Sequence, residues 1–162
     1  MTPRDYQIPA IQYLANIRRG ILQAPSGSGK TFMAGAALAD CLSRREGVAT
    51  VKVLCNTIEQ KGQWKDAFGH FPIIAKKAAV EISCHAASLD TWDADLLIVD
   101  ECQDLNRARQ ALALMFGRRL MLIGDENQAI YGFAGADAEL AEFRPVPLKA
   151  TAVLTHDNHV VR

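Results

Sequence analysis

The 162-residue chain is 49% apolar and 22% charged, a composition typical of one soluble folded domain that buries about 70% of its extended-chain surface. No apolar stretch approaches the ~20 residues of a membrane span, and the N-terminal residues do not form the apolar core of a signal peptide, so we expect no membrane association. Eighteen basic and eighteen acidic residues cancel, which excludes a strong overall positive field and restricts nucleic-acid binding to a local surface.

The cysteines are unlike those of a zinc site or a disulfide framework. They lie at positions 41, 55, 84 and 102, without Cys-x-x-Cys spacing. Three of them fall in or beside segments that we expect to be buried, which suits reduced thiols. We therefore expect a cytoplasmic protein.

Helical and strand-like segments alternate along the chain. Apolar spacing predicts helices over 5–18, 32–42, 58–68, 86–92 and 106–116. Apolar or β-branched runs predict strands over 20–23, 50–55, 78–84, 96–99 and 120–123, with 151–155 as a last strand or part of a tail. The alternation predicts an α/β fold, a mostly parallel sheet with helices on both faces and a ligand at the carboxyl ends of its strands. We expect one domain over residues 1–150 and a C-terminal strand or tail over 151–162.

A glycine-rich segment follows the first predicted strand and precedes a predicted helix. It reads Ala24-Pro25-Ser26-Gly27-Ser28-Gly29-Lys30-Thr31. Its backbone N–H groups can surround phosphate oxygens, Lys30 can reach the β- and γ-phosphates, and the Thr31 hydroxyl can bind Mg²⁺. Ala24 replaces the glycine that usually opens this motif, whereas Gly27 and Gly29 allow a close approach of the main chain. The segment predicts a site for a nucleoside triphosphate.

Two acidic residues end the clearest predicted strand. Asp100 and Glu101 follow 96–99, about 70 residues after Lys30, which puts them beside the phosphate loop at the carboxyl edge of the sheet. Asp100 is suited to hold Mg²⁺, directly or through water. Glu101 is suited to orient and polarise the attacking water, because phosphoryl transfer depends on positioning and charge stabilisation.

Polar residues also follow the predicted strand 120–123. The segment Gly124-Asp125-Glu126-Asn127-Gln128 allows a turn and brings polar groups toward the same edge. The Gln128 amide both donates and accepts hydrogen bonds, so it can link a phosphate oxygen or the attacking water to the protein. The alternative is that Gln128 is an ordinary polar loop residue.

Two of these segments resemble motifs II and III of superfamily 1 DNA helicases of the UvrD/Rep type. They are Val99-Asp100-Glu101-Cys102-Gln103-Asp104-Leu105 and Gly124-Asp125-Glu126-Asn127-Gln128-Ala129-Ile130-Tyr131-Gly132-Phe133-Ala134-Gly135-Ala136-Asp137. With the phosphate loop they cover the central two-thirds of the chain. The resemblance implies a first RecA-like P-loop domain that binds ATP and Mg²⁺ through Lys30 and Thr31. It further implies that Asp100 and Glu101 form the Walker B pair and that Gln128 couples the γ-phosphate to DNA.

The same resemblance implies single-stranded DNA as a partner. Tyr131 and Phe133 match aromatic positions near which bases pass, and stacking of a base on such a ring contributes roughly 1–3 kcal/mol whatever the sequence. The alternative is that both rings pack their loop against the core. Cys55-Asn56-Thr57 and Gln63-Trp64 resemble motif Ia of superfamily 2 translocases, which implies DNA contacts at Asn56 and Thr57. We expect Trp64 in the core.

The N-terminal segment Thr2-Pro3-Arg4-Asp5-Tyr6-Gln7 is similar to the adenine-recognising Q motif of helicases. That similarity makes Gln7 the candidate for pairing with the adenine edge. The alternative is a solvated glutamine on a helix surface.

Two departures from the UvrD/Rep pattern are visible. Residues 63–98 leave no room for the accessory subdomain inserted there in that family, and Ala134 stands where an arginine is usual. In this family ATP is cleaved between two RecA-like domains, so we expect weak ATPase activity that needs a second RecA-like domain or subunit. The alternative is an ATP-binding module or switch of a DNA replication or repair complex. A kinase or GTPase would not account for the segment 128–131.

Overall fold

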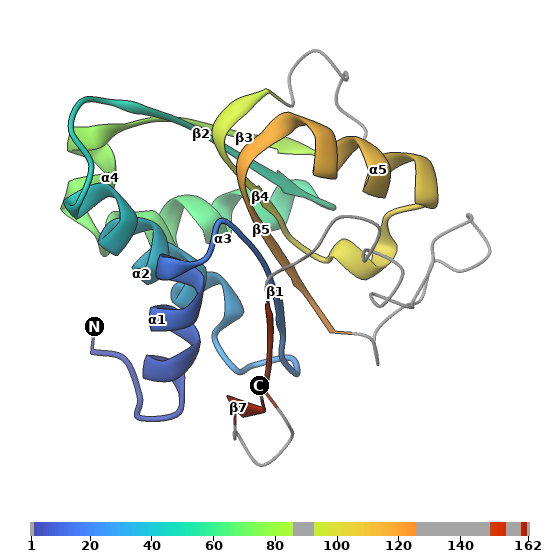
Figure 1. Ribbon diagram of the computed structural model, residues 1–162, viewed down its shortest axis with the longest axis horizontal. Coiled ribbons are helices and arrows are strands. Elements are labelled where there is room, and N and C mark those ends of the chain that lie inside the picture. The colour runs from blue at the N-terminus through green and yellow to red at the C-terminus, as the bar shows by residue number, and fades with distance from the viewer. Residues whose placement is uncertain (1, 86–92, 126–149, 155–159, 162) are drawn as a thin grey trace.

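The computed structural model describes residues 2–85, 93–125, 150–154 and 160–161, which build one sheet between two layers of helices (Figure 1). The sheet order is β3-β2-β4-β5-β1-β6-β7, and every neighbouring pair is parallel except β6 with β7. In chain order the elements are α1 (Gln7–Asn16), β1 (Arg19–Gln23), α2 (Lys30–Ser43), β2 (Ala49–Cys55), α3 (Ile58–Gly69), α4 (Pro72–Lys77), β3 (Ala78–Cys84), β4 (Ala94–Val99), η2 (Cys102–Asp104), α5 (Arg107–Phe116), β5 (Gly117–Gly124), β6 (Ala150–Leu154) and β7 (Val160–Val161).

Side chains on the central strands alternate between two hydrophobic cores. On β4, Leu96 and Ile98 face the core shared with α1 to α4, while Leu97 and Val99 face the core shared with α5. Figure 1 shows α5 across the sheet from α1, α2 and α3. A strand that is covered on both faces is apolar along its whole length, which explains why β4 gives the clearest strand signal in the sequence. The predicted parallel α/β fold with helices on both faces is confirmed.

Most predicted elements lie within a few residues of the observed ones. The strand 78–84 coincides with β3, and the segment that begins at 151 contributes β6, which pairs with β1. The observed helix α1 is shorter than the helix predicted over 5–18, because the backbone at Ile17 is already extended, with φ −92° and ψ 145°. Helix α4 has no counterpart in the prediction, since six residues are too few for a periodic pattern. The helix predicted over 86–92 lies outside the described residues.

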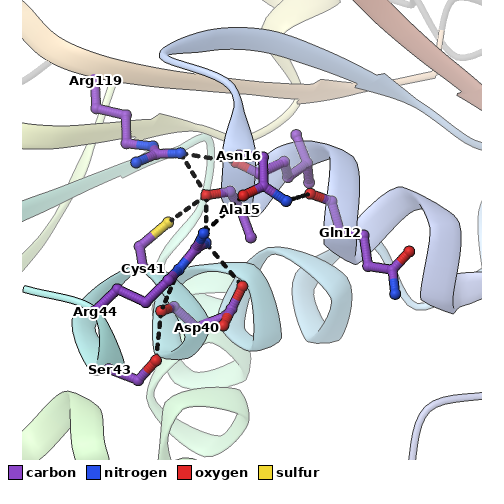
Figure 2. A network of polar contacts seen from close by, with 9 residues as sticks. Gln12, Ala15, Asn16, Asp40, Cys41, Ser43, Arg44 and Arg119 are labelled. Atoms are coloured by element: carbon purple, nitrogen blue, oxygen red, sulfur yellow. Dashed lines mark hydrogen bonds and ion pairs between the residues drawn. The ribbon is translucent and has the colours of Figure 1, made fainter.

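A polar network fixes the carboxyl end of α1 to its neighbours. The Ala15 carbonyl accepts hydrogen bonds from Arg44 Nη2 of α2 at 2.7 Å, from Arg119 Nη2 of β5 at 2.6 Å and from the Cys41 thiol at 3.4 Å (Figure 2). The last carbonyls of a helix have no partner within it and carry partial negative charge, so the two guanidinium groups are well placed. The other end of α1 contacts the phosphate loop through Gln7, whose side chain donates to the Ser28 carbonyl.

The sheet order brings the phosphate loop, Asp100 and Glu101 to one edge. Strands β4, β5 and β1 are consecutive neighbours, and the loops that follow them leave from their carboxyl ends. A backbone hydrogen bond from Ala24 N to the Gly124 carbonyl at 3.1 Å joins the ends of β1 and β5, and one from Asp100 N to the Leu54 carbonyl at 2.8 Å joins the ends of β4 and β2. Among the described helices, none has the length and apolar character to cross a membrane.

Candidate functional site

The phosphate loop turns through two glycines in the left-handed region, Gly27 at φ 76° and Gly29 at φ 83°. Gly29 is the N-cap of α2, whose hydrogen bonds begin with Met33 N to the Gly29 carbonyl at 2.9 Å. The first N–H groups of this helix therefore have no helical acceptor, and the helix dipole favours an anion there. A Cβ atom on residue 29 would lie 2.6 Å from Nε2 of Gln7, so glycine is required here both for its backbone angles and for space.

Lys30 is held across this loop. Its residue is only 9% exposed, and Nζ donates a hydrogen bond to the Ala24 carbonyl at 3.0 Å. The Ser28 hydroxyl is buried, and within the described part of the chain it has no hydrogen-bond partner. A buried ammonium, an unpartnered hydroxyl and the free N–H groups of α2 together fit the oxygens of a phosphate chain.

Gln7 contacts the loop directly. Its Nε2 donates to the Ser28 carbonyl at 2.9 Å, its Oε1 accepts from Arg4 N at 3.0 Å, and the Tyr6 hydroxyl donates to the same Ser28 carbonyl at 3.1 Å. Since Gln7 is buried, the alternative of a solvated helix residue is wrong. A cavity of about 290 Å³ opens beside it, lined by Thr2, Arg4, Tyr6, Gln7, Gly27, Ser28, Gly29 and Phe32.

Asp100 is a buried carboxylate with two donors. Trp64 Nε1 donates to its Oδ2 at 2.8 Å, and Glu101 N donates to its Oδ1 at 3.1 Å. Burial, together with the negative charge of Glu101, raises the pKa of Asp100 to about 6, while the Trp64 hydrogen bond and the positive charge of Lys30 oppose this shift. At neutral pH the group is a carboxylate close enough to Lys30 to sense its charge.

Glu101 adopts a backbone conformation that is rare for its residue type. Its angles of 50° and 48° lie in the left-handed region, and it is the single non-glycine residue with positive φ among those described. Such a conformation costs on the order of 1–3 kcal/mol and persists only where the surroundings enforce it. Gln103 Nε2 donates to Glu101 Oε2 at 2.7 Å, and Asp104 N donates to the Glu101 carbonyl at 3.0 Å.

The residues that resemble motif Ia lie at the carboxyl end of β2, on the same sheet edge. The Asn56 side-chain amide donates to the Asp104 carboxylate. Thr57 is exposed and is the N-cap of α3, where its hydroxyl accepts from Gln60 N at 3.3 Å. Both side chains therefore have structural partners within the domain.

Three of the predicted site residues cannot be located. Gln128, Tyr131 and Phe133 lie outside the described residues, so their predicted roles stay predictions. Two residues that do contact the site had no role assigned from the sequence. Trp64 lies in the core as expected, and it also donates a hydrogen bond to Asp100, which the sequence does not predict. Gln103 belongs to the segment that resembles motif II, and it donates a hydrogen bond to Glu101.

The donor set fits Mg²⁺ held jointly with a phosphate. Among the described residues, no three His, Cys, Asp or Glu side chains gather into a metal-binding group. Mg²⁺ is usually held by one or two protein oxygens together with phosphate oxygens and water, and does not need such a group. The Asp100 carboxylate and the Thr31 hydroxyl at the start of α2 can supply those oxygens.

Comparison with known proteins agrees with this architecture. The sequence profile of the type III restriction enzyme, res subunit family (ResIII), matches residues 1–130. The chain is 33% identical over 76 residues to the mitochondrial ATP-dependent DNA helicase HMI1 of Saccharomyces cerevisiae, a match that covers 42% of this chain and 11% of that protein. The UvsW helicase from bacteriophage T4 has a similar structure, with a TM-score of 0.61 at 16% identity over 85% of this chain and 58% of that one. At that identity the likeness is one of fold, the RecA-like fold of helicase domains.

Proposed function

Because the chain belongs to the type III restriction enzyme res subunit (ResIII) family, we propose that it is the ATP-binding and ATP-hydrolysing motor domain of a DNA helicase or translocase. The observation that carries this proposal is the placement of the phosphate loop after β1 and of Asp100 and Glu101 after β4 on one edge of the sheet, where burial raises the pKa of Asp100 and the positive charge of Lys30 lowers it. The helicase relative and the RecA-like fold support it. The matched region is a small part of the yeast relative, so the activity of a whole helicase is part of the proposal.

In this proposal ATP lies along the phosphate loop. The base would occupy the cavity beside Gln7, whose position against the Ser28 carbonyl ties that cavity to the loop. Residues 25–31 would surround the phosphates through backbone N–H groups, with Lys30 turning from the Ala24 carbonyl to a phosphate oxygen. Mg²⁺, when bound, would neutralise charge on the β- and γ-phosphates from the Thr31 hydroxyl and the Asp100 carboxylate.

The protein groups then perform the remaining tasks. Glu101, next to Asp100 and fixed by Gln103, would orient the attacking water and accept its proton. Trp64 would keep the Asp100 carboxylate ionised and aimed by donating to one of its oxygens. Gln128 would sense the γ-phosphate. In this scheme the rate of ATP hydrolysis depends on the positioning of the attacking water and on the stabilisation of charge around the γ-phosphate, as phosphoryl transfer requires.

The finer assignment also belongs to the proposal. The segments that resemble motifs II and III favour a superfamily 1 type related to UvrD and Rep, with a compact first half that is closer to superfamily 2. Single-stranded DNA would contact Asn56, Thr57, Tyr131 and Phe133. The motor domain would span residues 1–150, with 151–162 as a C-terminal strand or tail. A cytoplasmic location and a role in DNA replication or repair stay predictions.

We further propose that efficient turnover needs a second RecA-like domain, carried by a longer chain or by another subunit. Arginine supplied across such an interface raises phosphoryl-transfer rates by roughly 10³–10⁵ where it has been measured. The domain alone should therefore hydrolyse ATP slowly.

Steady-state ATP hydrolysis with and without single-stranded DNA tests the proposed function. We expect slow Mg²⁺-dependent turnover that DNA stimulates, and a loss of about 100-fold or more in Lys30→Ala. Lys65→Ala makes the same change at an exposed position of α3 and should behave as wild type. Saturable ATP binding without any turnover, even with DNA and a second RecA-like domain, would instead favour an ATP-binding module.

A further inference from the structure

The short turn η2 lies where three strand ends meet. It follows Glu101 after β4, and its side chains contact residues that follow β2 and β5. Gln103 contacts Asp125 after β5, and Asp104 accepts a hydrogen bond from Asn56 after β2. Three segments that are distant in the sequence are thus connected through two consecutive residues.

Gln103 is a buried amide whose two ends have different partners. It is 1% exposed. Its Nε2 donates to Glu101 Oε2 at 2.7 Å, and its Oε1 accepts from Asp125 N at 3.1 Å. An amide has one donating and one accepting end, so exchanging the ends would lose both hydrogen bonds. The orientation of this side chain is therefore fixed from both sides.

The end of β5 is shaped around this amide. A Cβ atom on Gly124 would lie 2.3 Å from Gln103 Oε1 and 3.0 Å from the Cys102 sulfur. Both distances are below ordinary van der Waals contact, so any larger residue at position 124 would displace Gln103 or the strand. Glycine at this position leaves the space that Gln103 needs to reach Asp125.

Glu101 needs such support. Its left-handed backbone is strained, and of the hydrogen bonds described above that hold it, the one from Gln103 acts on the carboxylate itself. The carboxylate of Glu101 is thereby connected through a single side chain to the backbone of Asp125, the residue that follows β5.

We propose that Gln103 is a positioning residue, which holds the Glu101 carboxylate in its working orientation and couples it to the backbone of Asp125 at the end of β5. A displacement of the Asp125 backbone would pull on Gln103 Oε1 and thereby move the Glu101 carboxylate. This inference rests on the proposed role of Glu101 in ATP hydrolysis.

Two substitutions separate the two ends of the amide. Gln103→Met removes both hydrogen bonds with little change in volume. Gln103→Glu keeps an acceptor for Asp125 N but replaces the donor with a second carboxylate facing Glu101. We expect both variants to lower kcat by about 10- to 100-fold, with the affinity for Mg-ATP within about 3-fold of wild type. Gln12→Met makes the methionine change at an exposed position of α1 and should change neither value.

Hydrogen exchange at the Asp125 amide gives a readout that does not depend on turnover. We expect slow exchange in wild type and Gln103→Glu, and fast exchange in Gln103→Met. Glu101→Ala should accelerate this exchange in wild type, because Gln103 loses one of its two anchors, and should add nothing in Gln103→Met. An exchange rate at the Asp125 amide that is the same in wild type and in Glu101→Ala would overturn the coupling.

The outcomes distinguish failure of this inference from failure of the proposed function. A wild-type protein without ATPase activity would contradict the proposed function, while the exchange measurement would still test the link between Glu101 and Asp125. Wild-type kcat in Gln103→Glu would overturn the positioning role. If Gln103→Met fails to fold, the kcat and ATP affinity of Gln103→Glu test the positioning role. A parallel loss of ATP affinity and kcat in Gln103→Glu would show that Gln103 has a merely structural role.

Discussion

The indole Nε1 of Trp64 donates a hydrogen bond of 2.8 Å to the carboxylate of Asp100, joining helix α3 to the end of β4 inside the core. Trp64 is fully buried and also packs edge-on against Phe68, with ring centroids 5.4 Å apart. A residue that the sequence identifies as core thus also contacts the acid proposed to hold Mg²⁺. The packing of α3 and the charge state of the site are therefore linked.

Trp64→Phe should weaken Mg²⁺ binding. The variant keeps an aromatic ring but loses the donor, so the pKa of Asp100 should rise above about 6 and fewer molecules should carry the carboxylate at neutral pH. We expect a few-fold higher Mg²⁺ concentration for half-maximal ATP binding and a loss of about 1–3 kcal/mol in the free energy of unfolding. Phe68→Leu disturbs the same packing without removing a donor. An identical Mg²⁺ requirement in the two variants would contradict the role of the hydrogen bond.

His85 should make the protein less stable in mild acid. Burial lowers its pKa from 6.5 to about 4, so between these values the unfolded chain binds a proton that the folded chain excludes. Stability from this group therefore rises with pH over that window, by up to about 3 kcal/mol. The contribution of Asp100 to stability falls as pH rises, because its pKa is raised in the folded state. A comparison between variants therefore isolates the contribution of His85.

That comparison uses urea unfolding of wild type and His85→Leu between pH 4 and 7. The stability of wild type relative to His85→Leu should increase as pH rises toward 6.5. His70→Leu, at an exposed position, should leave the pH dependence unchanged. Parallel curves for wild type and His85→Leu would show that His85 titrates normally.

Gly124→Ala should destabilise the fold through Gln103. The added methyl group would lie 2.3 Å from Gln103 Oε1, and we expect a cost of about 1–3 kcal/mol in chemical unfolding. In a Gln103→Ala background the closest obstacle is gone and the Cys102 sulfur at 3.0 Å remains, so the same substitution should cost at least about 1 kcal/mol less than in wild type. Gly62→Ala, in the open middle of α3, should be neutral or slightly stabilising. Equal costs of Gly124→Ala in both backgrounds would rule out the clash.

Arg119→Met should release the carboxyl end of α1. The Ala15 carbonyl would lose its 2.6 Å hydrogen bond, and we expect about 1–3 kcal/mol of lost stability. The neighbouring Arg118 provides a matched control, since its side chain is 78% exposed and its ion pair with Asp95 is 3.6 Å long, so Arg118→Met should cost less than about 0.5 kcal/mol. Thermal unfolding measures the loss of stability in the two variants. Equal losses of stability would argue against a specific role of Arg119.

Local signals in the sequence were sufficient to predict the fold and to place the phosphate loop and the acidic pair after strands of the sheet. Strands covered on both faces are apolar along their length, and the phosphate loop and the Asp100-Glu101 pair each stand at a strand end that is readable within ten residues. Parallel strands then bring such ends to one edge. The ends of α1 and the existence of α4 depended on packing and capping and could not be read from periodicity.

The contacts that orient the site could not be predicted in the same way. Trp64 and Asp100 are 36 residues apart, and Gln103 and Asp125 are 22 apart. Nothing in an apolar pattern distinguishes a core tryptophan whose N–H reaches a carboxylate from one that only packs. The one available signal was the place of Gln103, two residues after Glu101, in the segment that resembles motif II.

Equilibrium binding of Mg-ATP to the chain, measured by titration calorimetry, tests whether the loop at residues 24–31 and Asp100 form an ATP site. We predict saturable binding whose affinity decreases without Mg²⁺, falls by about 10-fold or more in Lys30→Ala, and is unchanged in Lys65→Ala. Absence of saturable binding, or equal affinity in wild type and Lys30→Ala, would contradict the proposal that the loop at residues 24–31 and Asp100 form an ATP site.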